Sequence, residues 1–188
     1  MYEVIWHGRG GQGVVVAAQI LAEAAYLEGY KGVTSAPTFG PERRGAPLTA
    51  STKISREPIR TFAQIETADT AVVLDASILK VVDVFSSLKS GGFIILNTPL
   101  SAEDLAVPGC FNIAVVNASA IALSRHLIKE DAPIVNTPLL GAFARATALV
   151  SLESIETIFK KKLPAGVVTG NILTLRDAFE KTSVKAAV

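Results

Sequence analysis

The residue pattern with the clearest chemical potential is a glycine-rich segment near the start of the chain. It follows the short apolar run Val4-Ile5-Trp6 and precedes an apolar stretch from Val14 to Glu28. A strand, a glycine loop and a helix in this order present backbone N–H groups and the positive end of a helix dipole to a phosphate. The candidate phosphate-binding residues are Gly8, Arg9, Gly10, Gly11, Gln12 and Gly13. The alternative is structural, because glycines also permit a tight turn that packs a helix on a strand.

A second candidate is the segment Phe39-Gly40-Pro41-Glu42-Arg43-Arg44-Gly45. Its prolines and glycines disfavour regular structure and predict a rigid loop. Like the glycine loop, it follows a predicted strand, and open α/β sheets bind ligands beyond the carboxyl ends of their strands. Arg43 and Arg44 are therefore predicted to hold phosphate groups or to pair with carboxylates of a partner subunit. The alternative is an ordinary solvated loop.

A nicotinamide dinucleotide is one ligand that the glycine loop suggests, but the pattern is incomplete. The acid that binds the ribose normally stands about 20 residues further on, at the end of the second strand. Here that strand ends at Ala36-Pro37, and Glu28 lies before it. Because Arg43 or Arg44 could accept a 2′-phosphate, an NADP-dependent reductase stays open as an alternative.

No set of residues has the spacing of a catalytic site. We expect His7, beside the glycine loop, to be a hydrogen-bonded structural residue, and His126 to be a surface or structural one. The single cysteine, Cys110, is expected to be a small buried hydrophobe. Asp75 closes a predicted strand, but the sequence identifies no partner for it. We therefore predict no catalytic residue and no metal ligand in this chain.

Short apolar runs alternate with helical segments, which is typical of an α/β fold with a parallel sheet. The predicted strands are 4–6, 33–36, 48–54, 71–74, 93–97 and 112–116. We predict a mainly parallel sheet with helices on both faces. An antiparallel hairpin insertion is expected near residues 47–62, where Ser55 to Pro58 would turn the chain into Ile59.

Helical segments dominate the C-terminal third. The predicted helices are 14–28, 77–88, 102–105, 119–129, 138–150, 152–162 and 171–181. Thr137 and Ser151 are predicted to be N-caps, and Lys160 to Lys162 to complement the dipole at a helix end. Helix 138–150 is apolar and rich in small residues, which favours either burial in the core or a subunit interface.

Composition narrows the possible functions. The 188 residues fit one domain spanning 1–188, and a net charge of +1 gives no basic field for nucleic acid. Hydrophobic residues make up 49% of the chain and charged residues only 19%, so the chain is more apolar than a monomer requires. No apolar run reaches the roughly 18 residues of a membrane span. The start of the chain shows no signal peptide, so a cytoplasmic location is expected.

The two loops also resemble a known family. Residues 4–13, followed by residues 39–47, closely resemble the gamma subunit of 2-oxoacid:ferredoxin oxidoreductases. The pyruvate and 2-oxoisovalerate enzymes are the nearest types. The similarity continues through residues 54–59, 68–75 and 136–141 and covers roughly residues 2–162.

The resemblance implies a subunit of an enzyme of anaerobic metabolism. Such an enzyme converts a 2-oxoacid, coenzyme A and oxidised ferredoxin into an acyl-coenzyme A, carbon dioxide and reduced ferredoxin. In the family, the alpha and beta parts hold thiamine diphosphate with Mg, and the beta and ferredoxin-like delta parts hold [4Fe-4S] clusters. This chain would bind none of these alone. Its expected partners are the alpha, beta and, where separate, delta subunits, with ferredoxin as the electron acceptor of the complex.

The family's gamma part is a Rossmann-like domain that helps to form the coenzyme A site. Carried over, this places Gly8 to Gly13, Arg43 and Arg44 near the coenzyme A phosphates or at the subunit junction. The resemblance thus implies a non-catalytic gamma subunit that contributes to the coenzyme A site and to assembly. A purely structural scaffold and an NADP-dependent reductase are the alternatives.

Overall fold

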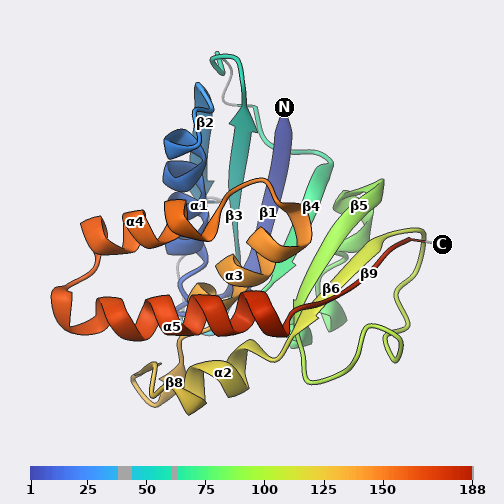
Figure 1. Cartoon of the computed structure of the whole chain (residues 1–188). Helices are drawn as coiled ribbons and strands as arrows, with labels where there is room; N and C mark the ends of the chain where they lie inside the picture. Colours follow the sequence, from blue (N-terminus) through green and yellow to red (C-terminus); the bar gives the residue numbers. More distant parts are fainter. Residues whose placement is uncertain (38–43, 61–62, 188) are drawn as a thin grey trace.

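The computed structural model describes residues 1–37, 44–60 and 63–187, and its centre is a seven-stranded sheet in the order β2-β3-β1-β4-β5-β6-β9 (Figure 1). The strands are β1 (Tyr2–Arg9), β2 (Gly32–Pro37), β3 (Pro47–Ser55), β4 (Ala68–Val73), β5 (Leu88–Asn97), β6 (Asn112–Val116) and β9 (Ser183–Lys185). β1, β4, β5 and β6 pair in parallel, whereas β3 and β9 run antiparallel to their neighbours. The predicted mainly parallel sheet is confirmed.

The predicted antiparallel insertion is β3, which lies between β1 and β2 and is antiparallel to both. Its expected hairpin partner does not form, because the described residues between Pro58 and the start of β4 (59–60 and 63–67) make no strand. The chain instead crosses close to the start of β2, where a Cβ on Gly32 would collide with the backbone oxygen of Glu57. The hairpin of β3 is therefore made with the preceding strand, β2.

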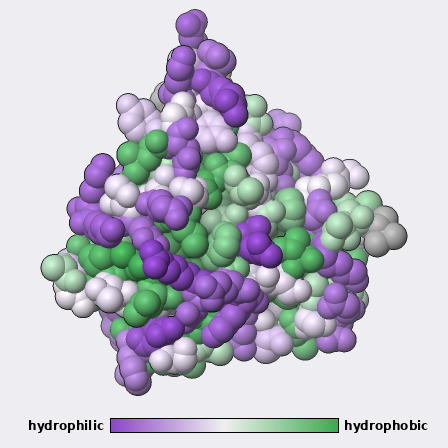
Figure 2. All heavy atoms as spheres, in the orientation of Figure 1, coloured by the Kyte–Doolittle hydropathy of each residue, from purple (hydrophilic) through white to green (hydrophobic). Residues whose placement is uncertain are grey.

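Five α-helices pack on one face of the sheet or at its border (Figure 1). They are α1 (Val14–Leu27), α2 (Ala118–Ser124), α3 (Asn136–Thr147), α4 (Leu152–Lys162) and α5 (Ala165–Lys181). The larger core lies between these helices and the sheet, around the fully buried Trp6, Phe143 and Phe159. Outside, the helical face carries a mixture of hydrophilic and hydrophobic side chains (Figure 2). The predicted helical C-terminal third is confirmed.

The opposite face of the sheet is covered differently from the prediction. Instead of an α-helix at 77–88, it carries two 3-10 helices, η1 (Ala76–Lys80) and η2 (Phe85–Ser87). Asp83 interrupts the helix because its carboxylate accepts the Ser86 N–H at 3.1 Å, a local bond that competes with helical pairing. The predicted short helix at 102–105 is absent too, and this stretch forms bends. Helices thus lie on both faces, and in the described part of the chain those on the second face are 3-10 helices.

Several helix boundaries also differ. Thr137 is not an N-cap but lies inside α3, where its hydroxyl bonds Asn171 Oδ1 at 2.6 Å. α2 ends at Ser124, and the chain then forms the small hairpin of β7 (Ile128–Lys129) and β8 (Ala132–Pro133). α5 begins at Ala165 rather than at residue 171. The Ser151 cap of α4 is confirmed, because its hydroxyl accepts the Ser154 N–H at 3.2 Å.

The apolar helix α3 is part of the core of this chain. All its residues from Asn136 to Ala144 are buried, and a Cβ on Gly141 would collide with the backbone oxygen of Leu175 in α5. Its small residues therefore allow α5 to approach closely, which supports the core interpretation of this helix. None of the helices in the described part of the chain is long and apolar enough to cross a membrane.

Candidate functional site at the carboxyl ends of β1 and β4

The glycine loop lies where the connections that follow two neighbouring parallel strands go to opposite faces of the sheet. α1 follows β1 on one face of the sheet, whereas η1 follows β4 on the other, and β1 and β4 are parallel neighbours. In open α/β sheets this arrangement leaves a crevice between the carboxyl ends of the two strands, where ligands bind. The loop from Gly8 to Gly13 therefore stands at the edge where a site is expected.

Three glycines of the loop occupy positions with different structural constraints. A Cβ on Gly8 would collide with the side chain of Val14. Gly13 has a φ of +78°, and a Cβ there would lie 2.5 Å from Asn136 Nδ2. Gly11 has a φ of +96° and open space above it. The structural explanation of the loop thus holds for Gly8 and Gly13, while Gly11 presents exposed backbone.

The N-terminus of α1 has the unpaired donors expected of an anion site. No side chain caps it and its first turn has no acidic residue. The amides of Gly11 and Gly13 donate to no group in the described part of the chain. Such N–H groups, together with the helix dipole, favour a negative charge.

Asn136, which the sequence did not identify as a site residue, brings the start of α3 to the same place. Its Nδ2 donates to the Gly13 oxygen at 3.3 Å. Its buried Oδ1 has no hydrogen-bond partner among the described residues. Because 123 residues separate Gly13 and Asn136, no local sequence pattern could have revealed this contact.

Arg9 and Gln12 use their side chains to hold the loop. Arg9 donates from Nε to Asp75 Oδ2 at 3.1 Å, from Nη1 to the Gly45 oxygen at 2.9 Å, and from Nη2 to Ser77 Oγ at 2.7 Å. Gln12 accepts the Arg9 N–H at 2.8 Å and donates to Asp75 Oδ2 at 3.3 Å. The structure thus supplies the partner that the sequence could not find for Asp75.

The described end of the second predicted loop, Arg44 and Gly45, meets the glycine loop, whereas residues 39–43 lie outside the described residues. The Gly10 amide donates to the Ala46 oxygen at 2.9 Å, and the Gly45 amide donates to the Gly10 oxygen at 3.1 Å. Arg44 forms a parallel bridge with Gly10, and its guanidinium, 74% exposed, pairs with Glu130 Oε2 at 2.8 Å. Arg43 lies outside the described residues. The structure therefore brings Arg44 beside the glycine loop, as the topology predicts.

Of the three remaining titratable candidates, His7 and Cys110 differ from the expectations. His7 is only 4% exposed, but neither ring nitrogen has a partner among the described residues, so the expected hydrogen bonds are absent. Burial lowers the pKa of His7 to about 4, which keeps the ring neutral at physiological pH. Cys110 is exposed rather than buried. His126 lies exposed after α2, as expected.

Glu28, the other candidate for a ribose-binding acid, is engaged elsewhere. Its Oε1 accepts the Ser151 N–H at 2.9 Å and the Ser154 hydroxyl at 2.6 Å, at the start of α4. Hydrogen bonds from Ser151 and Ser154 lower the pKa of Glu28 below its usual value. The carboxylate therefore caps a helix at the opposite end of α1, about 20 Å from the glycine loop.

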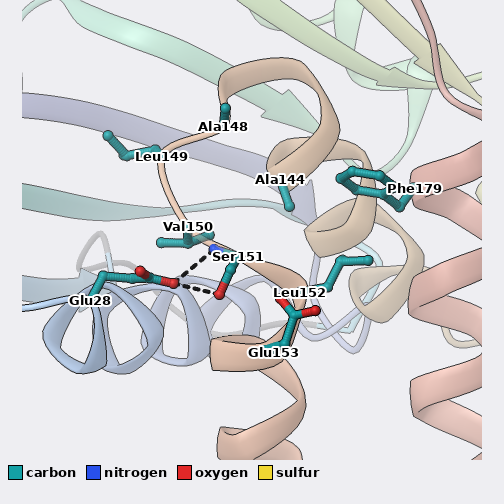
Figure 3. A pocket seen from close by; sticks show the side chains of 9 residues that line it. All are labelled: Glu28, Ala144, Ala148, Leu149, Val150, Ser151, Leu152, Glu153 and Phe179. Carbon is teal, nitrogen blue, oxygen red and sulfur yellow. Dashed lines mark hydrogen bonds between the residues drawn. The ribbon is translucent and has the colours of Figure 1, made fainter.

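A cavity of about 460 Å³ also lies at that opposite end (Figure 3). Figure 3 shows Glu28 bonded to Ser151 on one side of it and Phe179 on the other. Its lining residues are Glu28, Ala144, Ala148, Leu149, Val150, Ser151, Leu152, Glu153 and Phe179. Two of these are acidic and none is basic, so the cavity does not suit a phosphate-bearing ligand. Within the described residues, no group of three or more His, Cys, Asp or Glu could hold a metal ion.

Comparisons with known proteins identify the class. The sequence model of the pyruvate ferredoxin/flavodoxin oxidoreductase family matches residues 3–181. The chain is 47% identical over 187 residues to the common gamma subunit of the pyruvate/ketoisovalerate oxidoreductases of Pyrococcus abyssi, covering 98% of each chain. It is 45% identical over 183 residues to the pyruvate synthase subunit PorC of Methanothermobacter marburgensis, covering 96% of this chain and 97% of that one.

A solved structure agrees with both. Subunit PORC of the pyruvate oxidoreductase from Thermotoga maritima superposes with a TM-score of 0.81 at 35% identity, covering 98% of each chain. The chain therefore belongs to the pyruvate ferredoxin/flavodoxin oxidoreductase family. Within that family, its predicted resemblance to the gamma subunits is confirmed.

Proposed function

We propose that this chain is the non-catalytic gamma subunit of a 2-oxoacid:ferredoxin oxidoreductase, which converts a 2-oxoacid, coenzyme A and oxidised ferredoxin into an acyl-coenzyme A, carbon dioxide and reduced ferredoxin. The observation that carries this proposal is the 47% identity to a gamma subunit over 98% of both chains. The name of that relative makes it common to two oxidoreductases, for pyruvate and for ketoisovalerate. By analogy, the choice of 2-oxoacid belongs to the partner subunits.

We propose that thiamine diphosphate, Mg and [4Fe-4S] clusters are held by other subunits of the complex, as the family resemblance implies. Cluster ligation takes several thiolates, and the sequence has one cysteine. The described residues offer no group of three or more potential metal ligands. We therefore assign these groups to the alpha, beta and, where separate, delta subunits, and the reduction of ferredoxin to the complex.

Coenzyme A does fit the glycine loop. Its phosphates need N–H donors and positive charge, which the Gly11 and Gly13 amides, the start of α1 and the exposed Arg44 can supply. When bound, coenzyme A supplies the thiol that accepts the acyl group. This chain would then hold the phosphates through the amides of Gly11 and Gly13 and through Arg44 and Arg43. Arg9 and Gln12 would keep the loop in shape.

The NADP-dependent reductase is the weaker alternative. The crevice between β1 and β4, where a dinucleotide would lie, is spanned by the Arg9–Asp75 ion pair. Glu28 cannot bind a ribose because it caps α4. The scaffold alternative has better support, since Gly8 and Gly13 have packing reasons of their own.

Arginine variants in the reconstituted complex test the coenzyme A role. We expect Arg43→Ala and Arg44→Ala to leave assembly intact and to raise the KM for coenzyme A about tenfold, since a charge-assisted hydrogen bond is worth about 1.5–3 kcal/mol. Arg145→Ala is the matched control, because Arg145 is an exposed arginine that stacks on Phe179 near the far cavity. Failed assembly with an unchanged KM would support the scaffold. Normal assembly with an unchanged KM would exclude both roles for these arginines.

A further inference from the structure

Three segments far apart in the sequence converge beside the glycine loop. They are the loop itself, residues 44–47, and the start of η1 after β4. The side chain of Arg9 reaches the other two, donating to the Gly45 oxygen and to Asp75 and Ser77. Arg9 therefore acts as a strut between the segments, and its geometry depends on its acceptors.

Asp75 is the acceptor that organises this strut. Its Oδ1 accepts the Ser77 N–H at 2.9 Å and so caps η1. Its Oδ2 accepts both Arg9 Nε at 3.1 Å and Gln12 Nε2 at 3.3 Å. One carboxylate thus fixes the end of β4, the arginine strut and the glutamine that closes the glycine loop.

The electrostatics agree with a fixed carboxylate. The side chains of Arg9 and Asp75 are 29% and 26% exposed, so the pair is partly shielded from water. Partial burial alone would raise the pKa of Asp75, but hydrogen bonds from Ser77 and Gln12 and the charge of Arg9 together hold it below its usual value. Asp75 is therefore ionised at neutral pH and attracts both donors.

The consequence for a ligand follows from the position of the pair. Arg9 and Asp75 span the crevice between β1 and β4, whereas Gly11, with open space above it, and the exposed guanidinium of Arg44 can be reached by a phosphate from solvent. The position of Arg44 is set by the Gly10–Arg44 bridge and by the bond from Arg9 to Gly45. We propose that Asp75 is a positioning residue for the binding of coenzyme A. Through Arg9 and Gln12, Asp75 holds the glycine loop and residues 44–47 in fixed positions relative to each other. This inference rests on the proposed function.

Asp75→Asn in the reconstituted complex is the direct test. Asparagine keeps the shape and one acceptor for the Ser77 amide but loses the charge that orients Arg9. We expect the KM for coenzyme A to rise about tenfold, while kcat and the KM for the 2-oxoacid stay unchanged, since loss of a bound geometry appears as a loss of binding. Asp177→Asn is the matched control, because Asp177 also pairs with an arginine Nε, that of Arg125 at 2.7 Å, between α5 and the end of α2. It should leave all three constants unchanged.

Two further measurements separate positioning from general stability. Arg9→Gln should raise the same KM, and the Arg9→Gln/Asp75→Asn double variant should be no worse than the single ones, because both remove one strut. In the Asp75→Asn chain, hydrogen exchange should be about tenfold faster than in the unchanged chain at the Gly10 and Gly45 amides, which bond across the two loops. Exchange in β5 and β6 should not change. Unchanged exchange at both amides, or additive effects in the double variant, would overturn the inference.

The outcome of Arg44→Ala distinguishes the two proposals. If Arg44→Ala raises the KM for coenzyme A and Asp75→Asn does not, the positioning role is wrong and the proposed function stands. If neither variant changes that KM in an assembled complex, the coenzyme A role of this chain fails, and the positioning role fails with it.

Discussion

Gly13→Ala is expected to cost more stability than its backbone conformation alone explains. At a φ of +78° an alanine is strained by about 1 kcal/mol. Its Cβ would also lie 2.5 Å from Nδ2 and 2.8 Å from Cγ of Asn136. The buried asparagine must then move and lose its bond to the Gly13 oxygen, which adds about 1–2 kcal/mol. We therefore expect the free energy of unfolding to fall by about 2–3 kcal/mol.

Two comparison variants isolate the steric part. Gly11→Ala has the same kind of strain at a φ of +96° but meets no atom within 4 Å, so it should cost only about 1 kcal/mol. In an Asn136→Ala background the collision is gone, and Gly13→Ala should also cost about 1 kcal/mol. Urea unfolding followed by the fluorescence of Trp6, the single tryptophan, measures all of these. Equal costs for Gly13→Ala and Gly11→Ala would refute the close approach of α3 to the glycine loop.

The other predictions concern stability and pH. Burial lowers the pKa of His7 from 6.5 to about 4, so between these pH values the unfolded state binds a proton that the folded state does not. The free energy of unfolding should therefore fall by about 3 kcal/mol as the pH drops from 6.5 to 4. His7→Leu should remove this pH dependence in urea titrations at each pH. Glu28, whose pKa is lowered by bonds from Ser151, should stabilise the chain above pH 4.5 and lose that effect as the pH falls further, and Glu28→Gln should cost about 1 kcal/mol at pH 7 in the same assay. Gly141→Ala should lower the free energy of unfolding by more than about 2 kcal/mol because α5 blocks its Cβ, whereas Gly170→Ala, with open space in a helix, should raise it by up to about 1 kcal/mol in the same urea assay. The same sign for both would contradict the α3–α5 packing.

The buried strands were predictable because each is a continuous apolar run. The strand at 112–116 was predicted to the residue, since parallel strands covered on both faces leave little choice of side chain. The structure of segment 77–88 was predicted wrongly, because helical periodicity does not take into account the local bond from the Ser86 N–H to Asp83 that competes with the helix. The prediction of Thr137 as a cap was wrong for a different reason, because its hydroxyl bonds the distant Asn171, 34 residues away.

The candidate site, too, could be predicted only in part. Chain topology predicted that the glycine loop and the Arg44 loop would meet, because both follow strands at one edge of the sheet. The partners of Arg9 could not be predicted, since Asp75 stands 66 residues further on and only the fold brings them together. Nor could the approach of Asn136 to Gly13. Local patterns therefore identified the loops, and long-range contacts decided which side chains are engaged within the chain.

Purification of this chain under anaerobic conditions tests the central claim most directly. An affinity tag on the chain should recover larger subunits in a brown complex with iron–sulfur absorbance. That complex should reduce a viologen dye only when a 2-oxoacid and coenzyme A are both present. A colourless chain that purifies alone and binds NADPH would contradict the account and favour the reductase.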